Sequence, residues 1–138
     1  MKRLACLILA AALAAPAWAA DDSLYRALGE RSGIKALVAD FVARVAADAR
    51  ISESFKDIDI PNLKQRLEEQ FCELGGGPCV YKGKDMKTIH DGLNITVAQF
   101  NALAEDLQLA LSARGVPNAL QNKLIAKLAP MQRDIVTK

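Results

Sequence analysis

One histidine and three cysteines are the residues of this chain on which chemistry would first depend. His90 is the only imidazole, so it alone would have to activate a serine or cysteine nucleophile, and no nucleophile-elbow motif lies beside it. Cys72, Cys79 and His90 lack the CxxC spacing and the fourth ligand that structural zinc requires. The three glycines at 75–77 are followed by Pro78 rather than by Lys and Ser or Thr, so they do not predict a phosphate-binding loop.

Two interpretations of His90 remain open at this point. A lone histidine among apolar neighbours is typical of a core side chain that has found a hydrogen-bond partner. A neutral imidazole also serves as the single protein ligand of haem iron, which leaves the sixth coordination position for a small molecule. The second interpretation requires a large apolar slot, and the wide stripes of Leu, Val, Ile and Phe in the flanking segments permit one.

The elements that must position His90 are predicted to be helices. Apolar residues recur at three- and four-residue steps over 34–45, 63–74, 97–111 and 120–135, and no stretch alternates as a strand does. Before them, a short helix is expected around Leu24–Leu28, followed by a polar turn that Gly29 and Gly33 bracket. The sequence therefore predicts an all-α fold.

Helix boundaries are predicted by local signals. Pro61 suits a first helical turn, and the glycines at 75–77 followed by Pro78 should stop that helix. Asp85 can cap a short helix that carries His90. The pair Thr96 and Gln99 forms a capping-box signature, and Pro130 should kink the last helix.

The first nineteen residues have the pattern of a cleaved secretory signal. Lys2 and Arg3 are followed by an apolar run over 4–15 and then by Ala17-Trp18-Ala19, which supplies small residues at the cleavage site. The run is shorter than the roughly 20 residues that span a bilayer, so a membrane anchor is the weaker interpretation. We expect a signal peptide at 1–19, a single domain at 20–138, and export, in a Gram-negative bacterium to the periplasm.

Charge and cysteine content narrow the classes of partner. The 138 residues include 18 basic and 16 acidic ones, and without Lys2 and Arg3 the two kinds are equal in number. No basic run remains, so neither nucleic acid nor stable membrane insertion is expected. Cys6 would leave with the signal, and Cys72 and Cys79 would remain as a pair in an oxidising compartment. The hypothesis is a disulfide that braces the loop leading to His90, with two free buried thiols as the alternative.

A set of short motifs recurs in order along the chain and points to one family. The motifs are Leu28-Gly29, Gly33-Ile34, Phe41, Arg44-Val45, Ala47-Asp48, Phe55, Leu63-Lys64, Phe71, the run 74–78, Tyr81, Gly83, Met86, Ile89-His90, Ile95-Thr96, Phe100 and Gly115-Val116-Pro117. In this order and spacing the sequence resembles the group I truncated haemoglobins, short globins with a two-over-two helical arrangement. The resemblance runs from Leu24 to Pro130.

The resemblance implies haem b, with His90 as the proximal ligand of the iron. Arg66 matches a basic position that pairs with a haem propionate, for which a guanidinium is well suited. The remaining positions implied to contact the cofactor are Phe55, Leu63, Phe71, Tyr81, Met86, Ile95, Phe100, Leu103 and Leu128, with Val42 and Leu67 on the side opposite His90.

Two departures from the family pattern affect ligand binding. Val42 stands where the family usually has a tyrosine that donates to bound oxygen, and Leu67 stands where a glutamine often supports it. Without these donors we expect an apolar distal site, weak O₂ retention, easy oxidation of the iron, and a relative preference for CO and NO. Whether Gln70 brings a polar group to that site stays open, and Lys64 is expected to be a solvated lysine. Glu30 replaces a second glycine that is common after Leu28-Gly29.

The expected function is reversible binding of diatomic gases (O₂, NO or CO) by an exported, monomeric haem protein. One alternative is redox, electron-transfer or peroxidase-like chemistry on ferric haem, with an unknown reductase or electron donor as partner. A second alternative is a helical module that carries haem or binds something else. With one histidine, composition excludes coordination by two histidines.

Overall fold

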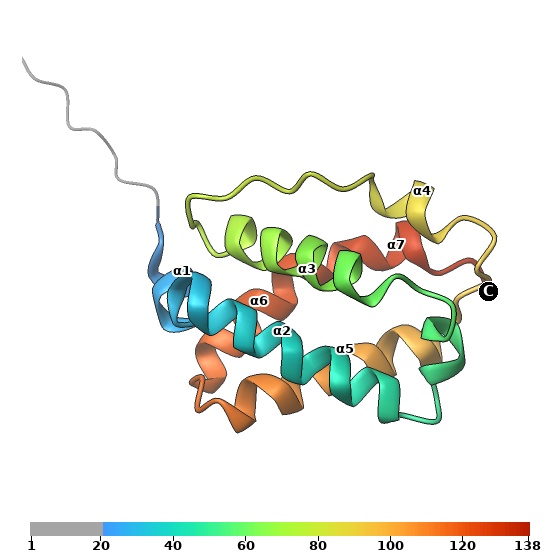
Figure 1. Ribbon diagram of the computed structural model, residues 1–138, viewed down its shortest axis with the longest axis horizontal. Coiled ribbons are helices and arrows are strands. Elements are labelled where there is room, and N and C mark those ends of the chain that lie inside the picture. The colour runs from blue at the N-terminus through green and yellow to red at the C-terminus, as the bar shows by residue number, and fades with distance from the viewer. Residues whose placement is uncertain (1–20) are drawn as a thin grey trace, which may run out of the picture.

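Helix α2 (Glu30–Ala47) lies at the centre of the molecule, between α3 (Ile60–Leu74) and α5 (Val97–Ala113), and packs against both (Figure 1). The computed structural model describes residues 21–138, so the signal peptide predicted at 1–19, with Cys6, lies outside the described residues. The other elements are α1 (Ser23–Ala27), η1 (Ser52–Phe55), α4 (Met86–His90), α6 (Asn118–Leu128), η2 (Ala129–Met131) and α7 (Gln132–Ile135). Within 21–138 the only β pairing is an isolated bridge between Ile95 and Val136. The all-α prediction is confirmed.

The polar turn predicted between Gly29 and Gly33 is wrong, because α2 already begins at Glu30. The turn between α1 and α2 consists of Leu28 and Gly29, and Gly29 takes a left-handed conformation with φ of 84°. Gly33 lies inside α2, where a Cβ would collide with the carbonyl oxygen of Leu28. Gly33 therefore allows α2 to approach the end of α1 closely and does not form a turn. Glu30 also has a positive φ of 56°, at the position where the family often has glycine.

The remaining boundary signals act as predicted. The Asp59 carboxylate accepts from the backbone N–H of Asn62 and begins α3, with Pro61 in its first turn, and the helix ends at Leu74 before the three glycines. Thr96 and Gln99 form the full capping box of α5. Pro130 divides the predicted last helix into three pieces, α6, η2 and α7, so the break is sharper than the kink that was expected.

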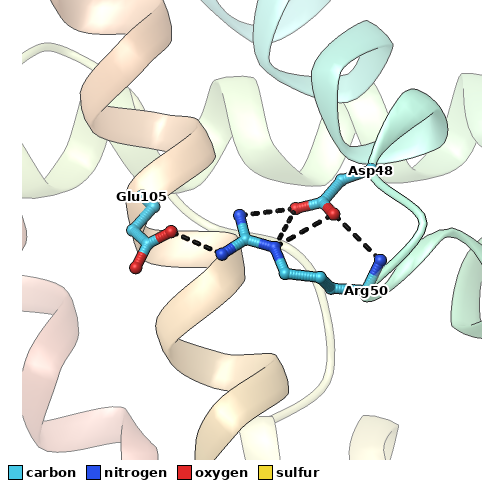
Figure 2. A network of polar contacts seen from close by, with 3 residues as sticks. All are labelled: Asp48, Arg50 and Glu105. Carbon is cyan, nitrogen blue, oxygen red and sulfur yellow. Dashed lines mark hydrogen bonds and ion pairs between the residues drawn. The ribbon is translucent and has the colours of Figure 1, made fainter.

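A network of charges fixes the end of α2 against α5 (Figure 2). Arg50 donates from Nε to Asp48 Oδ2 at 2.9 Å and from Nη1 to Glu105 Oε2 at 2.6 Å. Asp48 in turn accepts from the backbone N–H of Arg50 at 2.9 Å. These bonds lower the pKa of the Asp48 carboxyl and raise that of the Arg50 guanidinium. The turn that follows α2 is therefore held against α5.

Two links hold the segments around His90. The structure pairs Cys72, in the last turns of α3, with Cys79 in the following loop, with 5.7 Å between their Cα atoms. At the other side, the backbone N–H groups of Thr137 and Lys138 both donate to the carbonyl of Ile95, at 3.0 and 3.2 Å. The C-terminal residues therefore lie beside the segment that joins α4 to α5 (Figure 1).

Candidate functional site

His90 is the last residue of α4, which the sequence begins with a strong cap. The Asp85 carboxylate accepts from the backbone N–H and from the hydroxyl of Thr88, at 2.9 and 2.7 Å, and these bonds lower the Asp85 pKa. One turn later, His90 Nδ1 lies 2.7 Å from the carbonyl oxygen of Met86. A carbonyl only accepts, so Nδ1 carries the proton and Nε2 keeps its lone pair. The imidazole is held in the tautomer that a metal ligand needs.

Two adjoining cavities meet at His90. The larger has a volume of about 630 Å³ and the smaller, which lies deeper among α2, α3, α5 and α6, about 200 Å³. They share nine lining residues: Phe55, Leu63, Arg66, Tyr81, Ile89, His90, Phe100, Leu103 and Ile135. We call the larger one the outer cavity and the smaller one the inner cavity. Together they form a single crevice with His90 on its wall.

The structure brings all thirteen residues that the sequence singled out to this crevice. Besides the shared residues, Ile95 lines the outer cavity. The inner cavity is lined by the rest of the set: Val42, Leu67, Phe71, Met86 and Leu128. Their contacts with a cofactor remain a prediction, whereas their common position around one space is a property of the fold.

Arg66, on α3, lies on the wall of the crevice. Its Nη1 donates to Glu69 Oε2 at 2.9 Å, while its Nε is buried and has no partner. A buried guanidinium N–H is costly to leave without an acceptor. The wall beside it is completed by Tyr81, whose hydroxyl donates to the carbonyl of Lys84 at 2.9 Å and whose pKa is raised by burial. Arg66 thus offers a free donor to an acidic ligand group in the crevice.

Val42 and Leu67 place only hydrocarbon in the inner cavity, as the sequence suggested. The sequence left open whether Gln70 brings a polar group to this site. In the structure Gln70 lines the same cavity and is 8% exposed. Its Nε2 has two sulfur neighbours, Met131 Sδ at 3.7 Å and Met86 Sδ at 4.0 Å. Because Met86 belongs to the helix of His90, the Gln70 amide lies toward that helix.

Several lining residues were missed as site residues by the sequence. Phe41, Val45 and Leu107 were expected only as helix core, yet they line the inner cavity as well. Ile89 and Ile135 line both cavities. The signal that finds Val45, Leu107 and Ile89 is the helical face, because each lies one turn from a residue already assigned to the pocket. Within 21–138 no group of three or more His, Cys, Asp or Glu side chains could hold a metal ion, so His90 would ligate alone.

The residues present fit haem. A flat, largely apolar group with two carboxylates and a metal needs a wide apolar slot, a cation for its acids and one imidazole with a free lone pair. The crevice supplies the slot, the unpartnered Nε of Arg66 supplies the cation, and His90 Nε2 supplies the ligand. The exposed side chains of Ile89 and Leu93 at the outer cavity are surfaces that such a group would cover.

Comparison with known proteins gives a consistent result. Residues 23–137 match the family model of the bacterial-like globins. The group 1 truncated haemoglobin of Mycolicibacterium paratuberculosis is 34% identical over 115 residues, which cover 83% of this chain and 85% of that protein. The Fe(III) crystal structure of the truncated haemoglobin from Tetrahymena pyriformis is 32% identical, with a TM-score of 0.80 over 83% of this chain and 98% of that one.

The two-over-two haemoglobin of a Synechococcus species, solved with covalently attached haem, is 25% identical with a TM-score of 0.77 and covers 83% of this chain and 98% of that one. The resemblance inferred from the motifs between Leu28 and Pro117 is thus matched by the backbone over 83% of the chain. The chain belongs to the bacterial-like globins, and within them it groups with the group 1 truncated haemoglobins.

Proposed function

We propose that this globin binds haem b through His90 and reversibly binds small diatomic ligands, O₂, NO or CO, at the ferrous iron. The observation that carries the proposal is the hydrogen bond from His90 Nδ1 to the Met86 carbonyl, which leaves Nε2 free at the wall of an apolar crevice. When bound, haem would supply the iron that takes the gas, and the chain would supply His90 Nε2 as its ligand and an apolar cavity. Nothing in the described residues favours the redox protein or the haem-free module over this function.

Visible spectra of the haem-loaded protein test the proposal. The ferric, ferrous and CO forms should give a sharp Soret band that shifts on CO binding, and His90→Ala should lose or alter it. The matched variant His90→Gly should regain the wild-type spectrum when imidazole is added, because free imidazole can take the vacated position. Wild type and His90→Ala with the same weak haem binding would contradict the assignment of His90.

Arg66 is proposed to hold a propionate of the haem, since it lines the crevice and its Nε is buried and unpartnered. An Arg66→Met variant keeps the apolar stem but removes the charge, so haem should dissociate faster from it. The transfer of haem to an excess of apomyoglobin measures that rate. Arg26→Met, which changes an exposed arginine of α1, is the matched control and should transfer haem at the wild-type rate.

We propose that the protein binds O₂ weakly, because Val42 and Leu67 offer no hydrogen-bond donor on their side of the inner cavity. The Gln70 amide is directed toward Met86 and Met131 and does not replace the missing pair. Bound O₂ develops negative charge, so the absence of a hydrogen-bond donor weakens its binding most. The binding of CO and NO is weakened little. Fast O₂ dissociation and rapid oxidation of the iron are the expected behaviour.

We also propose that the protein is exported and that it contains a disulfide bond. The signal pattern at 1–19 supports secretion to a bacterial periplasm, and the mass of the secreted chain would show whether cleavage follows Ala19. The pairing of Cys72 with Cys79 in the structure supports a disulfide, which a thiol titration of the unreduced protein would contradict by finding two free thiols. A monomer is proposed for the assembly, with sedimentation velocity as its test.

A further inference from the structure

Glu69 is a carboxylate of α3 that joins two elements through one oxygen. Its Oε2 accepts from Arg66 Nη1 at 2.9 Å and from the backbone N–H of Lys82, in the loop after α3, at 3.0 Å. Only 16% of the Glu69 side chain and 24% of the Arg66 side chain are exposed. Solvent weakens such a shielded ion pair less than it weakens a pair on the open surface. Glu69 therefore fixes both of its partners relative to α3.

The loop that binds Glu69 is itself firmly attached. Cys79 is paired with Cys72 of α3, and the Arg31 guanidinium of α2 donates to the Pro78 carbonyl at 3.2 Å. The N–H group that this loop gives to Glu69 therefore comes from a backbone held to two helices. It keeps the carboxylate in one place, so that Glu69 is a fixed acceptor.

The bond to Glu69 uses one end of the Arg66 guanidinium and leaves the rest of it to the crevice. Arg66 lines both cavities, and its Nε is buried without a partner. The guanidinium is planar and rigid, so a bond at Nη1 restricts the rotation of the whole group, Nε included. Without that bond the long side chain would regain rotamer freedom, which a ligand would have to remove again on binding.

The negative charge of Glu69 works against the binding of an acid. A carboxylate beside Arg66 offsets part of the positive charge that would attract a propionate, which is itself a carboxylate. What Glu69 contributes is thus the fixed position of Arg66, and for this an acceptor oxygen is sufficient. Both bonds go to Oε2, so a glutamine, which has one carbonyl oxygen, could make both of them.

We propose that Glu69 is a positioning residue for haem, which holds the Arg66 guanidinium where its buried Nε–H can bind a propionate. The proposal rests on the proposed haem function and on the proposed role of Arg66, and it adds to them a residue outside both cavities. Because Glu69 does not line either cavity, it acts on haem through Arg66.

The transfer of haem to an excess of apomyoglobin tests this role. Glu69→Met removes the acceptor, so haem should leave about three- to tenfold faster than from the wild type, the usual effect of one lost hydrogen bond. Glu69→Gln keeps the acceptor and should transfer haem no faster than the wild type. A wild-type rate in Glu69→Met, or a Glu69→Gln variant as fast as Glu69→Met, overturns the proposal.

Glu68→Met is the matched control, because Arg66 pairs with Glu69 and not with this neighbouring glutamate of α3. It removes a carboxylate from the same turn of the helix and should transfer haem at the wild-type rate. Haem loss from Glu68→Met as fast as from Glu69→Met would show that any charge removed here has the same effect, which contradicts positioning through the bond to Arg66.

Two further comparisons separate positioning from a general effect on the fold. In the double variant Glu69→Met with Arg66→Met, haem should leave at the rate of Arg66→Met alone. Haem dimethyl ester, whose esterified propionates carry no charge, should leave the wild type and Glu69→Met at the same rate. An effect of Glu69→Met that persists in either comparison shows that Glu69 supports the fold, and overturns the proposal.

The haem-free protein gives a readout that does not depend on the cofactor. In its proton–nitrogen NMR spectrum the Arg66 Nε–H signal, identified by its loss in Arg66→Met, should exchange slowly with water because Nε is buried. Exchange should be faster in Glu69→Met and unchanged in Glu69→Gln. Equal exchange in the wild type and in Glu69→Met overturns the proposal.

Failure of the haem function would give a different pattern. A wild type that takes up no haem contradicts the proposed function, and an Arg66→Met variant that transfers haem at the wild-type rate contradicts the proposed role of Arg66. In both cases the inference about Glu69 falls as well, even where the exchange of the Arg66 Nε–H responds to Glu69→Met.

Discussion

Single side chains determine what the pocket holds and how tightly. His90 and Arg66 are two polar residues of the crevice that are proposed to hold haem, and Val42 and Leu67 are residues of the inner cavity that offer no donor to its ligand. The sequence suggested these four assignments through its resemblance to the group I truncated haemoglobins, whose motifs match this chain position by position. The direction of the Gln70 amide could not be predicted, since a helical face shows that a residue lies near a pocket but not which atoms of its neighbours it meets.

The first prediction restores the donors. In the double variant Val42→Tyr with Leu67→Gln, O₂ dissociation from the ferrous protein should slow by about ten- to a hundredfold, which corresponds to a hydrogen bond of roughly 1.5–3 kcal/mol to a charged acceptor. Stopped-flow replacement of O₂ by CO measures the rate. Val42→Phe with Leu67→Met has similar bulk without donors. If that control slows dissociation equally, filled volume rather than hydrogen bonding controls O₂ release.

Asp106 carries the second prediction. It is 5% exposed, and its Oδ2 has no partner. Burial raises its pKa, the nearby Asp48 carboxylate adds to this effect, and Arg50 and Arg44 partly offset it. A carboxyl whose pKa rises on folding favours the folded state below its ordinary pKa of 3.8 and loses that contribution as the pH rises through the folded value.

Asp106→Asn removes this ionisation, so the variant should gain stability over the wild type as the pH rises from 4 to 7. We expect a difference on the order of 1 kcal/mol at pH 7, the usual cost of a buried polar group without its partner. Urea unfolding across this pH range measures it. Glu73→Gln, at an exposed carboxyl, is the control. A stability difference that does not depend on pH would show that the pKa of Asp106 does not change on folding.

At the scale of elements, the sequence predicts best where a boundary depends on local chemistry. The caps at Asp85 and Thr96 and the stop after Leu74 act within one turn, so the sequence contains all the information. Gly33 misled the prediction because its role is to let α2 approach the Leu28 carbonyl, a contact between two elements. The three pieces into which Pro130 divides the last helix likewise depend on what each packs against.

The link between α3 and the following loop carries the third prediction. Replacing both cysteines, Cys72→Ser with Cys79→Ser, should lower the free energy of unfolding by about 2–3 kcal/mol, because the open loop gains freedom in the unfolded chain. Chemical denaturation of both proteins measures the loss. The wild type with reductant should match the variant, and a variant as stable as the oxidised wild type would show that no bond forms.

At the scale of the whole molecule, the crevice leaves apolar side chains uncovered. Ile58, Ile89 and Leu93 line the outer cavity and are 40%, 43% and 47% exposed. Surface of this kind marks a ligand-binding groove when it is contiguous. A bound haem would cover these side chains, so we treat the cofactor as part of the core. Within 21–138 no helix is both long and apolar enough to cross a bilayer.

The fourth prediction follows from that view. Haem binds the folded chain, so loading it should raise the melting temperature by several degrees, as any ligand selective for the native state does. It should also reduce the binding of a dye that fluoresces on apolar surface. Differential scanning calorimetry of apo and loaded protein measures the first effect. His90→Ala should show a smaller gain, and equal melting temperatures of apo and loaded wild type would contradict the role of haem in the core.

The attachment of Thr137 and Lys138 to the Ile95 carbonyl has a practical consequence for purification. Ile95 lines the outer cavity, so the last two residues lie next to a wall of the pocket. A polyhistidine tag appended after Lys138 would place several imidazoles beside a protein that has one histidine of its own. Those added side chains can compete for the iron and imitate a six-coordinate spectrum. Affinity handles therefore belong at the other end of the chain, or should be removed before any spectrum is recorded.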